Sequence, residues 1–269
     1  RRGTPYIKIP TTLLGQVNVG VAFKVGVNFE RAKNFVGDFH PPLATLTDTT
    51  FLDSYPAKRH VRSGIGEMIK IAIASNAKLF SKLEAHAAQL LNGKDFHGRD
   101  AIVYEAALEH AKHIAADPME EKSGQPHLFG HTLAHGIETA TDFRWAHGEA
   151  VAFDVLLSSR IAHNLGFLND TAFGRIVKLY RSVGFLLSHP KVSRAFVEDG
   201  FRKAERRPFI LPAAIGKVTY VDSLEDKDID LAIDFVEQLA RAPSKGGANV
   251  AQRRSSSPVN ENLPVKRSV

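Results

Sequence analysis

The sequence contains no cysteine, and none of its apolar runs approaches the length of about eighteen residues that a membrane-spanning helix needs. Disulfide bonds are therefore excluded, and any zinc ion would be bound by histidine and carboxylate side chains. No signal peptide is recognisable, and no glycine-rich GxGxxG turn occurs anywhere in the 269 residues. We therefore expect a soluble, cytoplasmic protein without a dinucleotide-binding turn of its own.

The net charge of +6 is concentrated at the C-terminus. Residues 241–269 contain six basic side chains and one acidic one, so this tail carries +5 and the preceding chain is nearly neutral. The tail is rich in serine, proline and glycine and has no aromatic residue, whereas a nucleic-acid-binding face combines basic with aromatic side chains. We predict that residues 241–269 are disordered and that neither nucleic acid nor a membrane is a partner.

The apolar pattern after residue 52 has the three- and four-residue spacing of amphipathic helices. Before it, residues 6–10 alternate like a short strand, and residues 15–37 mix glycine, valine and asparagine as strands and turns around a ligand do. Helices are predicted at residues 61–75, 77–91, 101–116, 125–141, 147–165, 171–183 and 226–239, with a strand at 215–221. The sequence thus predicts a mainly α fold, divided into residues 1–55, a helical domain at 56–240 and the tail at 241–269.

Three histidines and a glutamate, His131, His135, His147 and Glu149, lie within a stretch of about twenty residues. His131 and His135 are four residues apart, so on a helix they would share one face. Together with Glu67, the pair His131 and His147 gives the two-histidine, one-carboxylate ligand set that catalytic zinc uses with one position left open. The alternative is a solvated or buried histidine pair without a metal, because the chain contains twelve histidines.

Five segments resemble, in order and spacing, the dehydroquinate synthase superfamily, the NAD- and zinc-dependent sugar phosphate cyclases. They are PTTLLGQVN (10–18), FKVGVNFERAKN (23–34), SGIGEMIK (63–70), GHTLAH (130–135) and HGEAVA (147–152). The resemblance covers residues 2–239 and only the C-terminal part of a family member. It implies a helical metal-binding domain, preceded by a remnant of the α/β nucleotide-binding domain whose N-terminal half is missing, with a homodimer as a candidate assembly.

The resemblance also implies roles for individual residues. Glu67, His131 and His147 would bind Zn²⁺ or Co²⁺; Lys24, Asn34 and Lys70 would contact the sugar phosphate; Thr11, Thr12, Asn18 and Lys33 would contact NAD; His135 and Glu120 would transfer protons. Simpler readings are a surface ion pair for Glu67 and Lys70, a packed helix histidine for His135, an exposed lysine for Lys33 and an acidic helix end for Glu120.

Several positions depart from the synthase pattern. Asn18 replaces the family's aspartate, His110 replaces a lysine, and Gly124 and Leu128 replace the arginine and asparagine before the zinc histidine. Residues 198–202 replace a late DKK segment. Because the lost groups are polar substrate contacts, the resemblance implies another sugar phosphate substrate or a degenerate homologue.

The reaction implied by the resemblance is oxidation of a ring hydroxyl by NAD, elimination of phosphate and aldol closure to a carbocycle, a carbon–oxygen lyase reaction. Without the nucleotide-binding half we expect the fragment to be inactive. Two alternatives remain open: a metal-dependent hydrolase with Glu149 or Glu138 as its base, and a non-catalytic homologue that acts in interaction or regulation.

Overall fold

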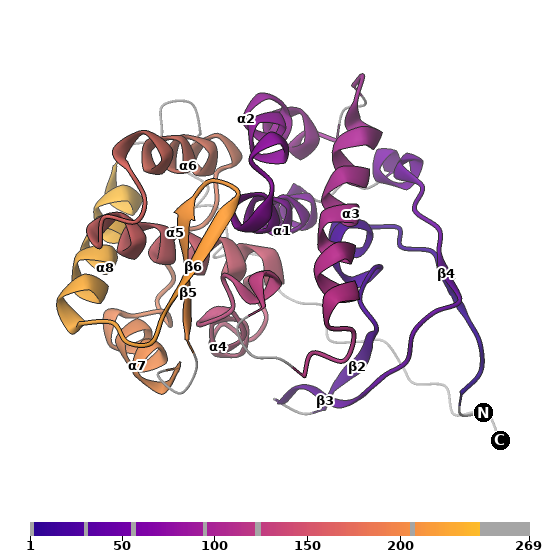
Figure 1. Cartoon of the computed structure of the whole chain (residues 1–269), viewed down its shortest axis with the longest axis horizontal. Helices are drawn as coiled ribbons and strands as arrows, with labels where there is room; N and C mark the ends of the chain where they lie inside the picture. The colour runs from indigo at the N-terminus through magenta and orange to yellow at the C-terminus, as the bar shows by residue number, and fades with distance from the viewer. Residues whose placement is uncertain are drawn as a thin grey trace, which may run out of the picture.

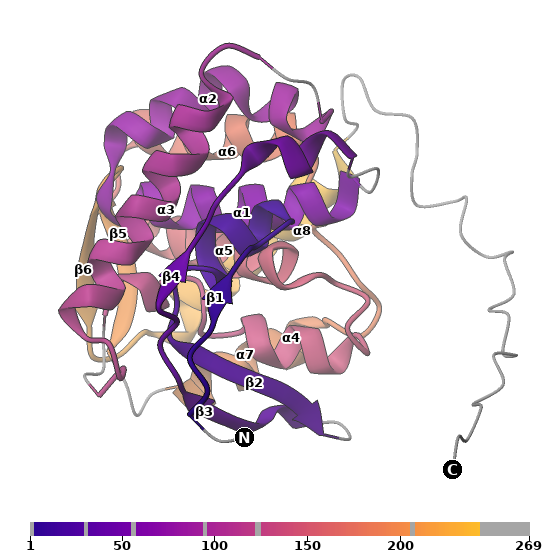
Figure 2. The ribbon, with the colours of Figure 1, turned by 90° about the vertical axis from the view of Figure 1, so that its right-hand side faces the viewer.

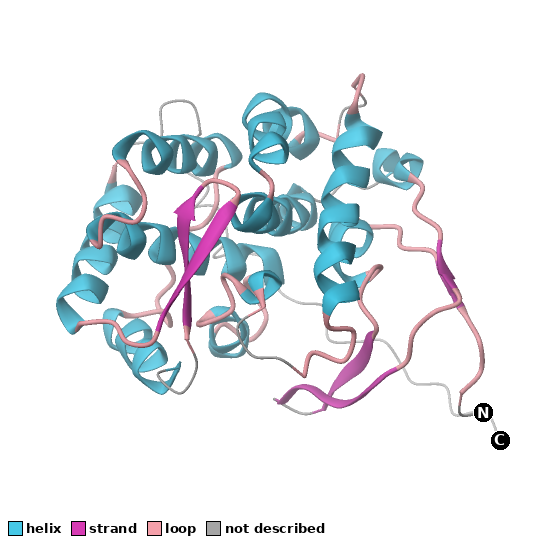
Figure 3. Ribbon diagram, viewed as in Figure 1, coloured by secondary structure: helices cyan, strands magenta, loops and turns pink. Residues whose placement is uncertain are grey.

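The computed structural model describes residues 3–29, 32–54, 58–93, 96–121, 125–204 and 208–242, and for residues 28 and 32–34 it describes the backbone without the side chains. Helices make up most of this part of the chain, and the strands are short (Figure 1, Figure 3). The predicted mainly helical fold is therefore confirmed. The predicted disordered tail falls almost entirely on residues 243–269, which lie outside the described residues.

The long helices form where the apolar pattern predicted them. They are α1 (Lys58–Ser75), α2 (Ala77–Leu91), α3 (Arg99–Ala116), α5 (His147–Asn164), α6 (Asp170–Val183) and α8 (Asp226–Arg241). The break between α1 and α2 falls at Asn76, because its side chain accepts a hydrogen bond from the N–H of Leu79 at 2.9 Å and so caps α2. Among the described residues, no helix is both long enough and apolar enough to cross a membrane.

The predicted helix at 125–141 is wrong in its first half. Pro126 opens a short 3₁₀ turn, η3 (Pro126–Leu128), and the helix α4 (Ala134–Ala140) begins only after a loop. Gly130 interrupts the helical path because its φ is +74°, in the left-handed region. A Cβ at Gly130 would also lie 2.5 Å from Cγ2 of Val155, so only glycine fits this turn.

Three further elements differ from the sequence prediction. Residues 15–19 form a π-helical turn, η1 (Gly15–Val19), where a strand or turn was predicted. The helix α7 (Arg194–Ala204) was not predicted, because its buried residues Val197 and Phe201 give too short an apolar pattern. The strand β5 (Phe209–Ala214) was also missed, because its apolar run contains a proline.

The strands form three separate two-stranded sheets. β1 (Ile7–Lys8) pairs in parallel with β4 (Ala44–Thr45), which is followed by the 3₁₀ helix η2 (Thr49–Ser54), and β2 (Lys24–Phe29) pairs antiparallel with β3 (Ala32–Phe39). β5 and β6 (Lys217–Val221) form a hairpin that turns at Gly216. The N–H of Gly216 donates to the carbonyl of Ile73 at 2.9 Å, so this hairpin is fixed on the end of α1.

The core is built around α1 and α5, which lie against each other in the middle of the molecule (Figure 1, Figure 2). Residues 63–74 of α1 and 148–159 of α5 are all buried. A helix that is buried on every side needs neighbours on every side. α2 and α3 supply them for α1, while α4, α6 and α8 pack against α5.

Two glycines bring α1 and α5 into backbone contact. A Cβ on Gly66 would lie 2.1 Å from the carbonyl oxygen of Gly148, and a Cβ on Gly148 would lie 1.8 Å from the carbonyl oxygen of Ser63. The N–H of Gly148 also donates to the Ser63 hydroxyl at 2.9 Å. This close approach places Glu67 of α1 beside His147, the first residue of α5.

Candidate metal centre and substrate cavity

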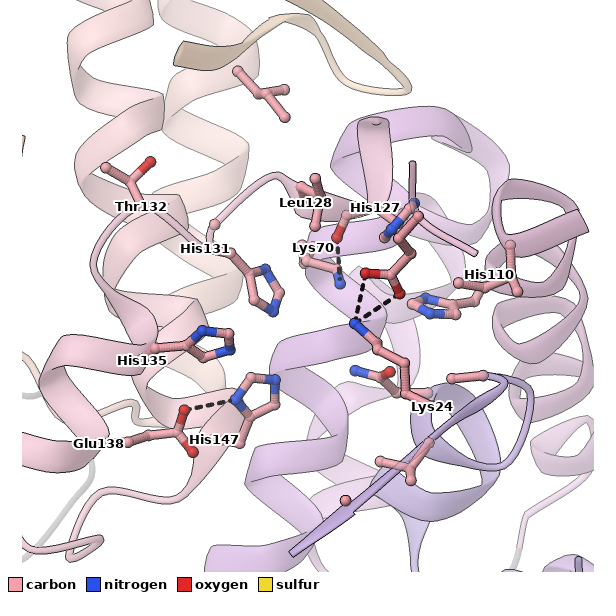
Figure 4. Close-up of a pocket in the computed structure, with 18 of the residues that line it drawn as sticks. Lys24, Lys70, His110, His127, Leu128, His131, Thr132, His135, Glu138 and His147 are labelled. Carbon is pink, nitrogen blue, oxygen red and sulfur yellow. Dashed lines mark hydrogen bonds and ion pairs between the residues drawn. The ribbon is translucent and has the colours of Figure 1, made fainter. Parts of the chain in front are cut away.

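A cavity of about 1080 Å³ opens between the helical body and the β2–β3 hairpin. One side carries His131, His135 and His147 together with Glu138 (Figure 4). The opposite side carries Lys24 and two further histidines, and Lys70 lies between the two sides (Figure 4). Its lining includes residues of η1, β2, β3, α1, α3, η3, α4, α5, α7 and β5, so segments far apart in the sequence build it.

His131, His135 and His147 meet on one side of this cavity. One ring nitrogen of each lies within 4.8 Å of a ring nitrogen of the other two, a spacing that could hold a metal ion. The ring centroid of His131 lies 5.5 Å from that of His135 and 5.3 Å from that of His147. His131 and His135 are thus close, as predicted, but they do not share a helix, because His131 precedes the first residue of α4.

Glu67 lies next to this group of histidines and is only 2% exposed. Its Oε1 is 3.2 Å from Nε2 of His147, and its Oε2 is 2.7 Å from Nζ of Lys70. Despite these short distances, neither oxygen has a hydrogen bond of good geometry among the described residues. A buried carboxylate that faces an imidazole nitrogen without well-formed hydrogen bonds fits a ligand of a cation.

The two predicted zinc histidines are oriented through their Nδ1 atoms. Nδ1 of His131 lies 3.1 Å from the carbonyl of Phe129, and because a carbonyl only accepts, the ring must donate there. Nδ1 of His147 donates to Oε2 of Glu138 at 3.0 Å. Each ring therefore keeps Nε2 for a metal, and carbonyl or carboxylate partners commonly orient metal-binding histidines in this way. The donor set fits a zinc or cobalt ion.

Burial and neighbouring charges set the protonation of these ligands. Burial lowers the pKa of His131 well below its usual value, and the charge of Lys70 lowers it further. Burial would raise the pKa of Glu67, but the charge of Lys70, together with the nearby His147, outweighs burial and holds that pKa well below its usual value. Burial lowers the pKa of His147, but its hydrogen bond to Glu138 and the nearby Glu67 carboxylate outweigh burial and raise it. A proton therefore competes with a metal most directly at His147.

A buried carboxylate fixes the loop between His131 and His135. Asp154 of α5 is fully buried, and its Oδ2 accepts the N–H of Leu133 at 2.6 Å. Its Oδ1 accepts the hydroxyl of Ser158 at 3.3 Å. The first N–H groups of a helix have no acceptors inside the helix. Asp154 of α5 provides an acceptor for one such N–H group at the start of α4. Burial nevertheless raises the pKa of Asp154 to about 6.

Replacing Asp154 with asparagine is expected to change how stability depends on pH. The pKa of Asp154 is about 6 in the folded protein against an ordinary value of 3.8, so the folded state binds this proton more tightly. The stability that this group contributes is therefore present below about pH 4 and is lost as pH rises through about 6. The loss is on the order of 3 kcal/mol, from a shift of about two pKa units.

Urea unfolding of metal-free wild type and Asp154→Asn, at about pH 4.5 and about pH 7.5, measures this effect. Asparagine does not titrate, so the unfolding free energy of the wild type should fall relative to the variant as pH rises. A difference between the two proteins that is the same at both pH values would show that Asp154 titrates normally.

Lys24 and Glu120, predicted for phosphate binding and proton transfer, bind each other. Nζ of Lys24 lies 2.6 Å from Oε1 and 2.7 Å from Oε2 of Glu120 (Figure 4). Both residues line the cavity, and Glu120 has a φ of +52°, which is uncommon for a residue with a side chain. A phosphate that reaches Lys24 must therefore compete with the carboxylate of Glu120.

Of the other residues predicted to contact the substrate or NAD, only some line the cavity. Asn18 and Lys70 line it, whereas Thr11 and Thr12 do not, and the Thr12 hydroxyl accepts the N–H of Gly15 at 3.1 Å. The predictions for Lys33 and Asn34 concern side chains that lie outside the described ones.

Three residues gain importance from the structure: Glu138, Asp154 and His127. Glu138 follows His135 by one helical turn, so its place on the same face of α4 could have been read from the sequence. Asp154 acts on a backbone N–H of a distant loop, and no local pattern marks such a contact. His127, in the segment GQPHLFG, also has no motif around it.

Residues 64–200 match the family described as 3-dehydroquinate synthase C-terminal, and residues 1–62 match 3-dehydroquinate synthase N-terminal. The chain belongs to this family. The resemblance predicted from the five sequence segments is thereby confirmed.

Several relatives and solved structures that the chain resembles are sugar phosphate cyclases. A 3-dehydroquinate synthase of Dictyoglomus thermophilum is 36% identical over 239 residues, which cover 86% of this chain and 66% of the relative. ValA, a 2-epi-5-epi-valiolone synthase from Streptomyces hygroscopicus subsp. jinggangensis solved with NAD⁺ and Zn²⁺ bound, is 30% identical with a TM-score of 0.82, and the match covers 87% of this chain and 67% of ValA.

A 2-deoxy-scyllo-inosose synthase, solved with carbaglucose-6-phosphate, NAD⁺ and Co²⁺, shares the fold at 21% identity with a TM-score of 0.68, covering 88% of this chain and 68% of that one. The cofactors predicted from the sequence are those bound in these two solved structures. The chain spans about three fifths to two thirds of the length of the curated relatives that it matches.

Proposed function

We propose that this chain carries the metal- and substrate-binding part of a sugar phosphate cyclase. The reaction is NAD- and zinc-dependent elimination of phosphate, followed by intramolecular aldol closure to a carbocycle. The observation that carries the proposal is the grouping of His131, His135 and His147, with Glu67 3.2 Å from His147, at a cavity that three lysines also line. A metal site beside cations suits a substrate that has both an oxygen to polarise and a phosphate to bind.

When bound, the metal would supply a Lewis acid and NAD a hydride acceptor. Glu67, His131 and His147 would hold the ion. His135 lies in the same group of rings, and an imidazole can transfer a proton to a departing phosphate oxygen near neutral pH. Lys24 would release Glu120 and bind the phosphate instead. The freed carboxylate of Glu120 could then accept a proton.

We further propose that the substrate differs from that of the 3-dehydroquinate synthases. His110 and Leu128 line the cavity at positions where the family resemblance expects a lysine and an asparagine, while Gly124 lies outside the described residues. A carboxylate-bearing substrate would leave polar groups unpaired here, at a cost of about 1–3 kcal/mol for each.

The 269 residues on their own are proposed to be inactive and to bind NAD weakly. Of the predicted NAD contacts with described side chains, Asn18 lines the cavity and Thr11 and Thr12 do not. The division at residues 55 and 240, a homodimer and a cytoplasmic location remain predictions. The alternative function is that of a non-catalytic homologue acting in interaction or regulation.

Joining the chain to the nucleotide-binding half of a cyclase such as ValA tests the proposal through phosphate release with NAD and zinc. We expect release from sedoheptulose 7-phosphate or a hexose 6-phosphate, and none from the joined protein carrying Glu67→Gln. The unfused chain should release none. Efficient conversion of the carboxylate-bearing precursor of dehydroquinate would refute the substrate proposal. If the joined protein released no phosphate from any sugar phosphate while intact ValA was active in the same assay, the result would favour the non-catalytic alternative.

A further inference from the structure

A second histidine pair lies across the cavity from the metal-side histidines. His110 of α3 and His127 of η3 are each only 4% exposed, and their ring centroids lie 6.1 Å apart with the rings inclined at 62° (Figure 4). Both line the cavity. Neither ring nitrogen of His127 has a hydrogen-bond partner among the described residues. Because a buried imidazole without partners is unfavourable, a ligand that supplies those partners gains affinity.

The two rings are neutral hydrogen-bonding groups. Burial, and after it the charge of Lys70, lowers the pKa of His110 to about 3 and that of His127 to about 4. A neutral imidazole offers one donor and one acceptor, and a hydroxyl group offers both as well. An ionised carboxylate only accepts hydrogen bonds, so it can pair with the N–H of each ring but leaves the acceptor nitrogen without a partner.

The cations beside this pair have carboxylate partners, and the phosphate is the anion that we propose displaces Glu120 from Lys24. Nζ of Lys70 lies 2.7 Å from Glu67, and Nζ of Lys24 lies 2.6 Å from Glu120. This histidine pair is also not the expected metal site. In the described part of the chain, the histidine group that could hold a metal ion lies on the other side of the cavity. The wall is therefore suited to an uncharged polar ligand group.

We propose that His127, with His110 beside it, determines specificity by binding substrate hydroxyl groups and disfavouring a carboxylate. The inference rests on the proposed function and narrows the substrate class to polyhydroxylated sugar phosphates that lack a carboxylate. It also assigns His127 a role that its surrounding sequence does not indicate.

Two unreactive ligands of equal length distinguish binding of a hydroxyl group from binding of a carboxylate. Sorbitol 6-phosphate ends in a hydroxymethyl group where 6-phosphogluconate ends in a carboxylate. Calorimetric titration of the zinc-loaded chain should show at least tenfold tighter binding of sorbitol 6-phosphate. His127→Leu should weaken that ligand about tenfold, the usual effect of losing one hydrogen bond, and leave 6-phosphogluconate unchanged. His127→Gln, which keeps a donor and an acceptor, should retain most of the affinity.

These substitutions leave the backbone carbonyl of residue 127 in place, and Nζ of Lys70 donates to that carbonyl at 2.9 Å. His113→Leu is the control, because His113 lies on α3 three residues after His110 but does not line the cavity. Equal affinity of the wild type for both ligands, or equal losses of both in His127→Leu, would overturn this inference alone. Failure of the zinc-loaded wild type to bind either sugar phosphate would overturn it together with the proposed function.

Discussion

Replacing Glu67 with alanine is expected to lower the unfolding free energy of the metal-free protein by about 3–5 kcal/mol. The side chains of Glu67 and Lys70 are each 1% exposed, and Nζ lies 2.7 Å from Oε2. Removing the carboxylate leaves a buried ammonium group without its anionic partner, with the carbonyl of His127 still accepting from it at 2.9 Å. The same substitution should remove zinc binding, because it deletes one of the three proposed protein ligands.

Two further variants test whether the stability lost in Glu67→Ala comes from leaving the buried charge of Lys70 unpaired. Glu67→Leu combined with Lys70→Met removes both charges and should recover most of the lost stability, while zinc binding stays lost. Glu84→Ala breaks an exposed pair with Arg175 and should cost at most about 1 kcal/mol. Urea unfolding followed by circular dichroism, with a chelator present, compares them. A cost of Glu67→Ala as small as that of Glu84→Ala would contradict the buried pair.

The helices were predictable where burial imposes a long, regular pattern. α2 begins and ends at the predicted residues because its apolar face repeats over fifteen residues and Asn76 caps it. The same reasoning failed at 125–141, where Pro126 and the left-handed Gly130 interrupt a sequence that still has helical spacing. A π-helical turn such as η1 has no sequence period of its own to recognise.

The sequence predicted which residues form the proposed metal site, but not the contacts that position them. The family resemblance supplied Glu67, His131 and His147, and the glycine contacts between α1 and α5 place Glu67 beside His147, whose ring centroid lies 5.3 Å from that of His131. The pairing of Lys24 with Glu120 joins residues 96 positions apart, so no local pattern could reveal it. The hydrogen bond from Leu133 to Asp154 likewise depends on how α4 packs against α5.

Elemental analysis of the purified chain tests the metal centre most directly. After zinc loading and dialysis, the wild type should retain about one zinc ion per chain, while His147→Ala should retain almost none because two remaining protein ligands do not hold the ion. His163→Ala is the matched control, since His163 also belongs to α5 but its Nε2 lies 2.7 Å from Asp170, outside the site. Zinc retained by His163→Ala and lost from His147→Ala is the predicted result. Equal zinc in the wild type and His147→Ala would contradict a centre formed by Glu67, His131 and His147.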